Sequence, residues 1–258
     1  MVNRADLVEL AESSTVYEPL KHGEELLVTD RFVLSLGRTE ATVQRLRLVA
    51  EDPPGTVEGV RQRALHHGCT AITWEVSAAA TPVDLAERLV TLGVLPAHPP
   101  VATVMGLVEP PAPAPDGIRV SRVETVADFR TFVAVTHEVF GIQERLADEL
   151  ERIDREGEHD VADTGFVRHL AWVEDEPVAA GAATFTDRGA ILHAGSTREA
   201  WRGRGAYRAL VAARWRDAVR RGTPALVTRA GPMSQPILAR LGFEELCELR
   251  LFVDRLDC

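Results

Sequence analysis

The stretch Trp201-Arg202-Gly203-Arg204-Gly205-Ala206-Tyr207-Arg208-Ala209-Leu210 decides how this chain is interpreted. It places a glycine-rich turn and three arginines at the start of a segment with helical periodicity. Glycine lets the backbone approach a ligand closely, and the first amides of a helix have no acceptor within the helix. Such a turn offers several N–H groups to one anion, and arginine adds charge-assisted donors. The stretch therefore predicts a phosphate-binding turn.

The segments on either side of this turn alternate between helix and strand patterns. Before the turn we predict helices over residues 126–139 and 144–156 and strands over residues 168–173, 178–185 and 190–197. After it we predict a helix over 206–221 that ends at Gly222-Thr223-Pro224, a strand over 225–228, a helix over 235–241 and a strand over 246–253. Within the helix after the turn, Ala209, Leu210, Ala213 and Val219 are spaced to form one buried face.

The first part of the chain repeats the end of this pattern. We predict a helix, a strand, a helix and a strand over residues 56–67, 70–76, 82–92 and 101–108. At the position of the arginine-glycine turn, this part carries Glu51 and Asp52, which would repel a phosphate. We therefore expect no ligand site there. The proline-rich residues 109–117 predict an extended linker between the two parts.

The order strand, RGRGAYRAL, helix, strand, helix, LGF, strand over residues 118–255 resembles the GNAT superfamily of N-acyltransferases, which take an acyl group from acyl-coenzyme A. Arg202 and Gly205 match the family signature [Q/R]-x-x-G-x-[G/A], whereas Tyr207 replaces its last small residue. The resemblance implies an α/β (α+β) fold of two GNAT-like units, with a mixed, mostly antiparallel sheet flanked by helices. It implies a degenerate GNAT-like domain over residues 1–108, the linker, and an acyl-CoA-binding GNAT domain over residues 118–258.

The same resemblance assigns residues to the acyl donor, acetyl-CoA, and implies no metal. The backbone near Gly195, Ser196 and Thr197 would pair with the pantetheine arm like an added strand. The diphosphate would be bound at Arg202, Gly203, Arg204, Gly205, Ala206, Tyr207 and Arg208. A dinucleotide fingerprint fails because its third glycine is missing, and the chain has no Gly-Lys-Ser/Thr for a Walker loop.

Three residues are candidates for proton transfer. His193, on the strand that leads into the turn, could deprotonate the amine, and Glu138 could bind or deprotonate it; the alternatives are a hydrogen-bonded strand histidine and a solvated carboxylate. In similar proteins a tyrosine often protonates the departing thiolate, but here Leu238 stands at the aligned position. Ser234 is the nearest hydroxyl by alignment, and its alternative role is a helix cap. We expect Tyr207 to lie beside the diphosphate, too far from the sulfur, so that water could serve as the acid.

Composition limits the possible partners. The net charge of −10 argues against nucleic acid and is compatible with a small cationic substrate. No apolar stretch approaches the ~20 residues that cross a bilayer, and acidic residues stand where a signal peptide is apolar, so we expect a cytoplasmic protein with no membrane partner. Cys69, Cys247 and Cys258 form no CxxC pair and are interpreted as thiols.

Together these features predict an N-acetyltransferase that moves an acetyl group from acetyl-CoA to an amine of a small molecule by direct attack. The N-terminal copy would cover a sheet edge that single-domain relatives often bury by dimerising, so we expect a monomer or a weak homodimer. The alternatives are a non-catalytic acyl-CoA sensor and an interaction scaffold.

Overall fold

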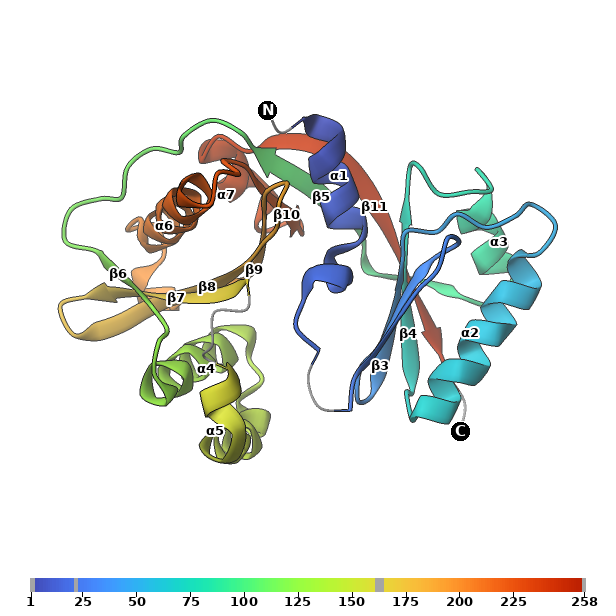
Figure 1. Ribbon diagram of the computed structural model, residues 1–258, viewed down its shortest axis with the longest axis horizontal. Helices are drawn as coiled ribbons and strands as arrows, with labels where there is room; N and C mark the ends of the chain where they lie inside the picture. Colours follow the sequence, from blue (N-terminus) through green and yellow to red (C-terminus); the bar gives the residue numbers. More distant parts are fainter. Residues whose placement is uncertain (1–2, 21–22, 161–164, 257–258) are drawn as a thin grey trace. The chain divides into compact units, whose positions relative to one another are not determined.

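The computed structural model describes residues 3–20, 23–160 and 165–256, with the side chains of residues 156–160 left aside (Figure 1). Two compact units share these residues. Unit 1 consists mainly of Gly106–Thr228 and also contains Leu241–Phe243. Unit 2 consists of Arg4–Met105, Arg229–Arg240 and the last strand of the chain.

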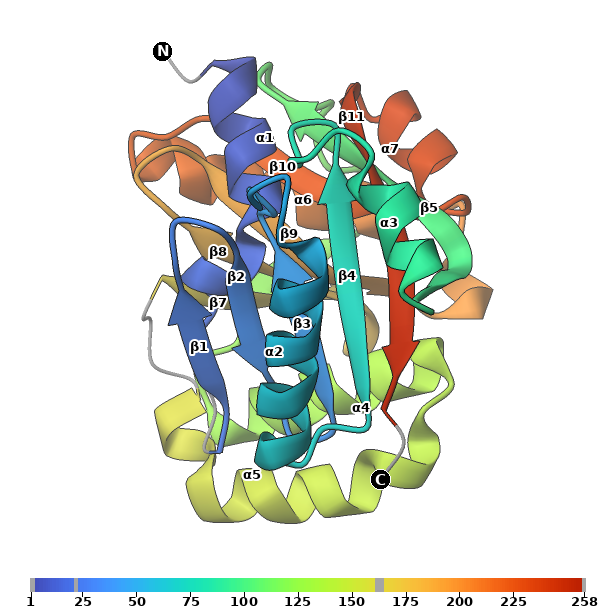
Figure 2. The ribbon, with the colours of Figure 1, turned by 90° about the vertical axis from the view of Figure 1, so that its right-hand side faces the viewer.

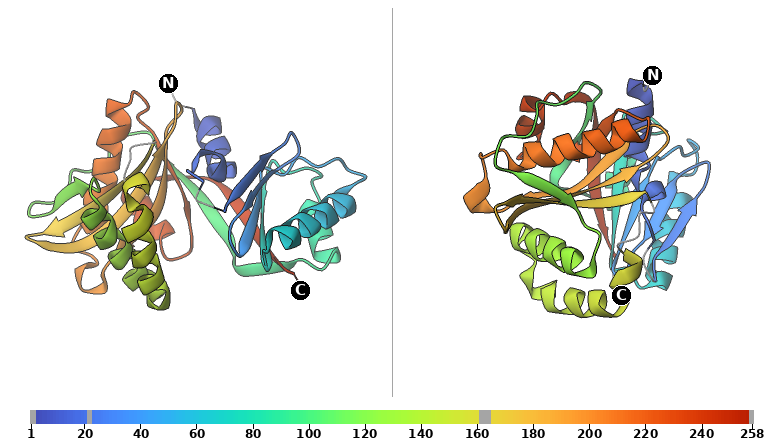
Figure 3. Two further views of the ribbon diagram at one scale, coloured as in Figure 1. Left: turned by 60° about the horizontal axis from the view of Figure 1, so that its bottom comes forward. Right: turned by 60° about the vertical axis from the view of Figure 1, so that its left-hand side comes forward.

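Unit 1 is a sheet between two layers of helices. Its elements are β6 (Arg119–Arg122), α4 (Val126–Phe140), η2 (Gln143–Arg145), α5 (Leu146–Asp160), β7 (Phe166–Val173), β8 (Glu176–Phe185), β9 (Ala190–Thr197), η3 (Glu199–Trp201), α6 (Ala206–Arg220) and the start of β10 (Leu226–Ala230). The strand order is β10-β9-β8-β7-β6; neighbours from β6 to β9 are antiparallel, and β10 is parallel to β9. α6 covers one face, and α4 and α5 cover the other (Figure 3).

Small residues let α6 lie close to the sheet. Ala206 and Ala209 on the helix and the buried residues 178–183 of β8 bring few side-chain atoms between helix and strand. On the other face α4 begins with a capping box, in which Thr125 and Asp128 bond each other's backbone amides, and it ends at Gly141 with φ of 68°. The start and the end of α4 are therefore fixed by these residues.

Unit 2 has a comparable arrangement of strands. Its elements are α1 (Arg4–Glu12), η1 (Ser14–Tyr17), β1 (Glu25–Val28), β2 (Val33–Leu36), β3 (Glu40–Gln44), α2 (Pro53–His67), β4 (Ala71–Ser77), α3 (Leu85–Thr91), most of β5 (Leu95–Leu107), α7 (Gln235–Arg240) and β11 (Glu244–Arg255). α2 connects the parallel strands β3 and β4 and packs over β2 and β4, just as α6 connects the parallel strands β9 and β10 (Figure 2). Trp74, with no exposed surface, lies in the core of this unit.

The predicted fold class is confirmed, because a mixed, mostly antiparallel arrangement of strands is flanked by helices. The linker has neither helix nor strand over residues 108–118, as its prolines predict. The compact units, however, do not follow the linker: β11 pairs with β4, from Leu249 opposite Ser77 to Arg255 opposite Ala71, and so belongs to unit 2. The domain assignment to residues 1–108, 109–117 and 118–258 stays a prediction.

Candidate functional site

The strand β9 has an unpaired edge. It pairs with β10 only at Ala190 and Ile191, and a last contact joins the Thr228 hydroxyl to the carbonyl of Leu192 at 3.2 Å. β9 continues to Thr197, and within the described ranges β10 offers no further register partner to it. An extended ligand with its own amide groups can bind such an edge as an added strand.

A bulge interrupts β9 at the start of this open edge. The register with β8 shifts so that Ala194 and Gly195 together oppose Gly181; we call these two residues the β9 bulge. Ala194 has φ of 48°, a left-handed conformation that costs energy for a residue with a side chain. Both bulge residues are exposed. A bulge bends the strand and redirects its backbone groups, so this is a place where peptide N–H and C=O groups face outward.

The glycine turn, residues 202–205, leads directly into α6. Gly203 and Gly205 have φ of 74° and 92°, and the first helical bond runs from the Ala209 amide to the Gly205 carbonyl at 2.9 Å. In the described part of the chain, no backbone carbonyl accepts from the amides of residues 203–208. α6 is 15 residues long, so its dipole adds positive potential at these amides. The turn therefore holds a set of donors suited to one anion.

The two glycines of the turn have different surroundings. A Cβ at Gly203 would meet nothing within 4 Å, so this side of the turn is open. A Cβ at Gly205 would lie 2.6 Å from Cγ of Pro115, because the linker packs against the turn there. Position 205 thus requires glycine because of both its backbone conformation and its packing against Pro115, whereas Gly203 leaves room for a ligand.

Arginine side chains surround the turn. The Nε of Arg202 donates to the Thr197 carbonyl at 3.4 Å, and the guanidinium of Arg204 lies over the Trp201 ring, 4.8 Å from its centroid. Arg208 has a buried Nε with no hydrogen-bond acceptor among the described residues. These cations add to the attraction of the free amides for an anion.

A surface cavity of about 620 Å³, wide open to solvent, lies beside the turn and is lined by Glu138, Glu176, Arg198, Glu199, Ala200 and Trp201. Arg198 forms ion pairs with Glu138 at 3.0 Å and with Glu176 at 3.8 Å. The Glu138 carboxylate, at the end of α4, is therefore held by a cation at the wall of this cavity. The structure brings this candidate residue next to the turn.

His193 lies on the sheet face covered by α4 and α5. Its Nε2 is 2.9 Å from the hydroxyl of Thr184, and its ring centroid is 5.7 Å from that of Phe166, which packs with α4 and α5. Ser234 belongs to unit 2, where its hydroxyl donates to the Gly231 carbonyl at 3.2 Å just before α7. Unit 1 thus contains two of the three catalytic candidates, His193 and Glu138, and their roles stay predictions.

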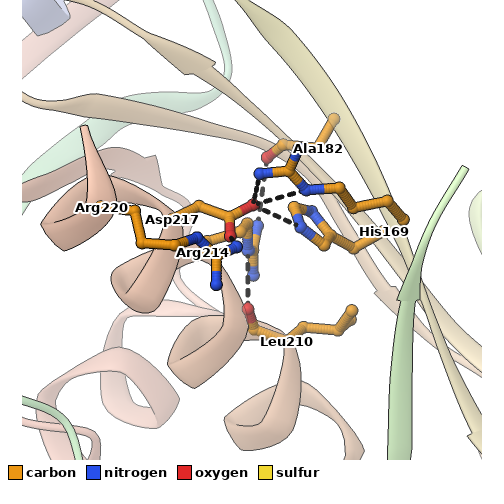
Figure 4. Close-up of polar contacts among 7 residues, drawn as sticks. His169, Ala182, Leu210, Arg214, Asp217 and Arg220 are labelled. Atoms are coloured by element: carbon orange, nitrogen blue, oxygen red, sulfur yellow. Dashed lines mark hydrogen bonds and ion pairs between the residues drawn. The ribbon is translucent and has the colours of Figure 1, made fainter. Parts of the chain in front are cut away.

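A buried polar network under α6 was not predicted from the sequence (Figure 4). Arg214 has no exposed surface, and Asp217 and His169 are each 2% exposed. Arg214 donates to the carbonyls of Leu210 at 3.1 Å and Ala182 at 3.2 Å. The Asp217 carboxylate accepts from His169 at 3.0 Å and also pairs with Arg122 at 2.9 Å and with Arg220.

Burial and charge fix the protonation of this network. Burial lowers the pKa of His169 and outweighs the opposite effect of Asp217, so the imidazole is neutral and donates through Nε2. Burial also raises the pKa of Asp217, but the hydrogen bond from His169 and the charges of Arg122 and Arg220 hold it below its usual value. Burial lowers the pKa of Arg214, and nearby Tyr207 opposes this.

One sequence prediction for α6 is wrong. Val219 was expected on the buried face but is 50% exposed, whereas Arg214 and Asp217 are buried. Arg214 and Asp217 follow the same helical spacing as the buried apolar residues, so the sequence did place them on the buried face. The prediction missed them because the periodicity rule counts only apolar residues toward that face.

Among the described residues, no cluster of three or more His, Cys, Asp or Glu side chains could hold a metal ion. No helix in the described ranges has the length and apolar character to span a bilayer.

Comparison with known proteins gives the family of folds. No family model matches the sequence, and no curated protein matches it. Among solved structures, a GCN5-related N-acetyltransferase from Kribbella flavida aligns with a TM-score of 0.69 and 16% identity over 90% of this chain and 89% of its own. A tandem GNAT protein from the clavulanic acid biosynthesis pathway aligns with a TM-score of 0.64 and 15% identity over 99% of this chain and 95% of its own. A GCN5-related N-acetyltransferase from Sphaerobacter thermophilus aligns with a TM-score of 0.60 and 19% identity over 95% of this chain and 84% of its own. The chain therefore has the fold of the GCN5-related N-acetyltransferases.

Proposed function

We propose that unit 1 is an N-acetyltransferase that transfers the acetyl group of acetyl-CoA to an amine of a small molecule by direct attack. The observation that carries this proposal is that unpaired backbone groups follow one another from the edge of β9 to the glycine turn. The unpaired edge of β9 ends at the glycine turn, where the amides of residues 203–208 have no backbone acceptor in the described chain. An elongated donor with amide groups and a diphosphate matches both features.

Each part of the donor has residues that fit it. The backbone of Gly195, Ser196 and Thr197 would bond the pantetheine arm at the open edge. The glycine turn and the amides of Ala206, Tyr207 and Arg208 would bind the diphosphate, and Arg202 and Arg204 would add charge. No metal is required for this binding, since the donors neutralise the anion.

The acceptor amine must lose a proton before it attacks the thioester carbonyl. His193 is the proposed base, because imidazole titrates near neutral pH and its strand leads into the donor path. Glu138, held by Arg198, lies in the wall of the cavity and is the proposed contact for the cationic acceptor. Ser234, carried by alignment alone, is proposed only as a hydrogen-bond partner of the leaving thiolate and not as its proton donor.

The corresponding helix of unit 2 supports a single donor site. At the start of α2, a Cβ at Gly55 would collide with the carboxylate of Asp52, so the chain's own anion lies where a phosphate would bind. Asp52 also lies 3.7 Å from Arg31. Negative charge at this helix start opposes the binding of a second anion. We infer that unit 2 has no acetyl-CoA site, and that the protein acts in the cytoplasm as a monomer or weak homodimer.

The direct test is turnover. Purified protein with acetyl-CoA and a panel of small amines should release free thiol only when an accepted amine is present. Binding of acetyl-CoA without thiol release for any amine would instead support the second candidate, a non-catalytic acyl-CoA sensor, which is favoured by Leu238 at the usual tyrosine position. A lack of any thermal stabilisation by coenzyme A would contradict both.

The glycine turn offers a matched pair of variants for the donor site. Gly203 and Gly222 lie near opposite ends of α6, have φ of 74° and 78°, and both have no atom within 4 Å of an added Cβ. Gly203→Ala and Gly222→Ala should therefore cost similar stability, about 1 kcal/mol. Only Gly203→Ala should weaken acetyl-CoA binding in calorimetry, by about tenfold, the equivalent of one charge-assisted hydrogen bond. Equal affinities for the two variants would show that the donor does not bind at the turn.

A further inference from the structure

Tyr207 does not lie only beside the turn, as its place in the sequence suggested. A Cβ at Gly195 would be 2.7 Å from Cε2 of the Tyr207 ring and 3.3 Å from its hydroxyl oxygen. The ring therefore packs directly against the backbone of the β9 bulge. The phenol hydroxyl reaches the part of β9 where regular pairing with β8 is interrupted.

Arg214 lies behind this tyrosine on the same helix. Its guanidinium carbon is 5.7 Å from the centroid of the Tyr207 ring, and a Cβ at Gly181 would be 3.0 Å from its Nη1. Gly181 and Gly195 oppose each other at the bulge, so two side chains of α6 contact the two strands at one point. Arg214 is fully buried, and its Nη2 has no hydrogen-bond acceptor among the described residues. A buried cation with an unused donor favours any negative charge that forms beside it.

The proposed base and this tyrosine lie on opposite faces of the sheet. His193 contacts Phe166 on the face covered by α4 and α5, whereas Tyr207 and Arg214 project from α6, which covers the other face. If the pantetheine arm binds along residues 195–197, its thioester end lies at the bulge between these two groups. His193 on one face can then accept a proton from the amine, while Tyr207 on the other face gives a proton to the sulfur.

On the basis of the proposed function, we propose that Tyr207 donates its phenolic proton to the departing thiolate of coenzyme A, and that Arg214 stabilises the phenolate that remains. The amine nitrogen forms a bond to the carbonyl carbon, the C–S bond breaks, and its electron pair takes the proton from the Tyr207 hydroxyl. His193 takes the proton that the amine loses, and solvent returns a proton to the phenolate. The products are an amide and a free thiol, with no oxidant or further reactant.

Burial supports the role of Arg214, since it disfavours the lone cation and so makes a neighbouring anion more favourable. Unit 1 has no other tyrosine, because the second tyrosine of the chain, Tyr17, lies in η1 of unit 2. Leu238 occupies the position at which similar proteins carry the tyrosine that protonates the thiolate.

The first experiment separates binding from the chemical step. Tyr207→Phe removes one oxygen and keeps the ring on the bulge, so the dissociation constant of acetyl-CoA should change less than twofold. kcat should fall about 100-fold, the lower end of the usual effect of a proton donor, because a thiolate is a fair leaving group. Arg214→Met should fold, since an apolar side chain of similar length replaces a buried charge. It should lower kcat about tenfold, and Arg214→Lys should recover part of this loss. The double variant should be no slower than Tyr207→Phe alone, because the two residues act as one unit.

The second experiment uses the presence of only two tyrosines. In the Tyr17→Phe background, growth on 3-fluorotyrosine labels position 207 alone. This more acidic phenol should move the alkaline limb of the kcat profile to lower pH, which a purely structural ring would not do. The ¹⁹F resonance should also shift when coenzyme A is added, whether or not turnover occurs.

These results distinguish the two proposals. Wild-type turnover with an unchanged kcat for Tyr207→Phe, or with an unmoved pH profile for the fluorinated protein, would overturn the role of Tyr207 and leave the acetyltransferase function intact. A ¹⁹F shift with coenzyme A but no turnover with any amine would overturn both the proton transfer and the enzyme function, while keeping the site. A ¹⁹F resonance that does not respond to coenzyme A would overturn the placement of Tyr207 at the thiol end.

Discussion

At the scale of single residues, the structure separates candidates of the same chemical type by their partners. The sequence contains eight histidines, and only geometry shows that His193 lies next to the open edge while His169 is buried against Asp217. Glu138 was expected to bind or deprotonate the amine, with a solvated carboxylate as the alternative; its side chain is 44% exposed and pairs with Arg198 at 3.0 Å, and its role stays a prediction. An ion pair of this kind is suited to holding a position in the cavity wall.

His193→Gln tests the proposed base. Glutamine can keep a hydrogen bond to Thr184 but has no group that titrates near neutral pH. We expect kcat to fall about 100-fold with unchanged acetyl-CoA affinity, and the acidic limb of the pH profile to disappear. Glu138→Gln is the comparison and should instead raise the KM of the amine. Steady-state kinetics with both substrates varied would measure each effect; wild-type kcat in His193→Gln would exclude this histidine as the base.

At the scale of elements, α6 organises unit 1. Its first amides face the glycine turn, Tyr207 contacts the β9 bulge, Arg214 contacts Gly181 of β8 opposite the bulge, and Asp217 binds His169 of β7. These three side chains lie on the helix face toward the sheet, where a purely apolar pattern was expected. Val219 is exposed because the buried positions of the last turns are taken by Asp217 and Ala218. A polar network of this kind fixes one helix position, since each group must keep its partners.

The network makes stability depend on pH. The pKa of His169 is lowered in the folded state, whereas an unfolded histidine titrates near 6.5. Below about pH 6.5 the unfolded chain therefore binds a proton that the folded chain resists, and stability is lost as the pH falls from about 7 to 5. His169→Gln keeps a donor for Asp217 but cannot titrate, so urea unfolding should show a smaller loss over this range.

The control for this measurement is His66→Gln, which changes an exposed residue of α2 and should keep the wild-type slope. The lowered pKa of Asp217 acts in the same direction but below about pH 4, outside the window. Identical slopes for wild type and His169→Gln would contradict the assignment of a neutral, buried imidazole.

At the scale of the whole molecule, chain order and compact units differ. The linker separates two sequence parts, yet β11, which follows the proposed catalytic elements in sequence, completes the sheet of unit 2 beside β4. Neither sequence part therefore contains all of its own unit. Unit 2 combines strands that lie far apart in the chain, because β11 covers the edge of β4.

Removal of residues 244–258 should test this exchange. Without β11, the backbone groups of β4 along Ala71–Ser77 lose their antiparallel partner. Hydrogen exchange measured by mass spectrometry should show faster exchange in this strand, whereas β7 in unit 1 should keep its protection. Unchanged protection of β4 would show that β11 does not cover it in solution.

The sequence by itself determined most of the helices and strands from residue 53 onward and led to the proposed acyl-CoA donor site. Long periodic segments such as α6 and α4 were predicted to within two residues, because burial of one face requires that period. The strands β1 to β3 and β6 were not predicted, because four or five residues show little alternation unless turn residues mark the strand, as Gly222-Thr223-Pro224 does for β10. The short helices α1 and η1 were not predicted either. The glycine turn predicted an anion site because local backbone geometry is sufficient to present free amides.

Only the tertiary structure decided which side chains and which strands contact one another. Packing of α6 on β8 and β9 brought Tyr207 to Gly195 and Arg214 to Gly181, residues that lie 12 and 33 positions apart in the sequence. The same packing buried His169 with Asp217, and strand pairing placed β11 beside β4. No local pattern encodes such contacts, because they depend on where each element lies when the whole hydrophobic surface is buried.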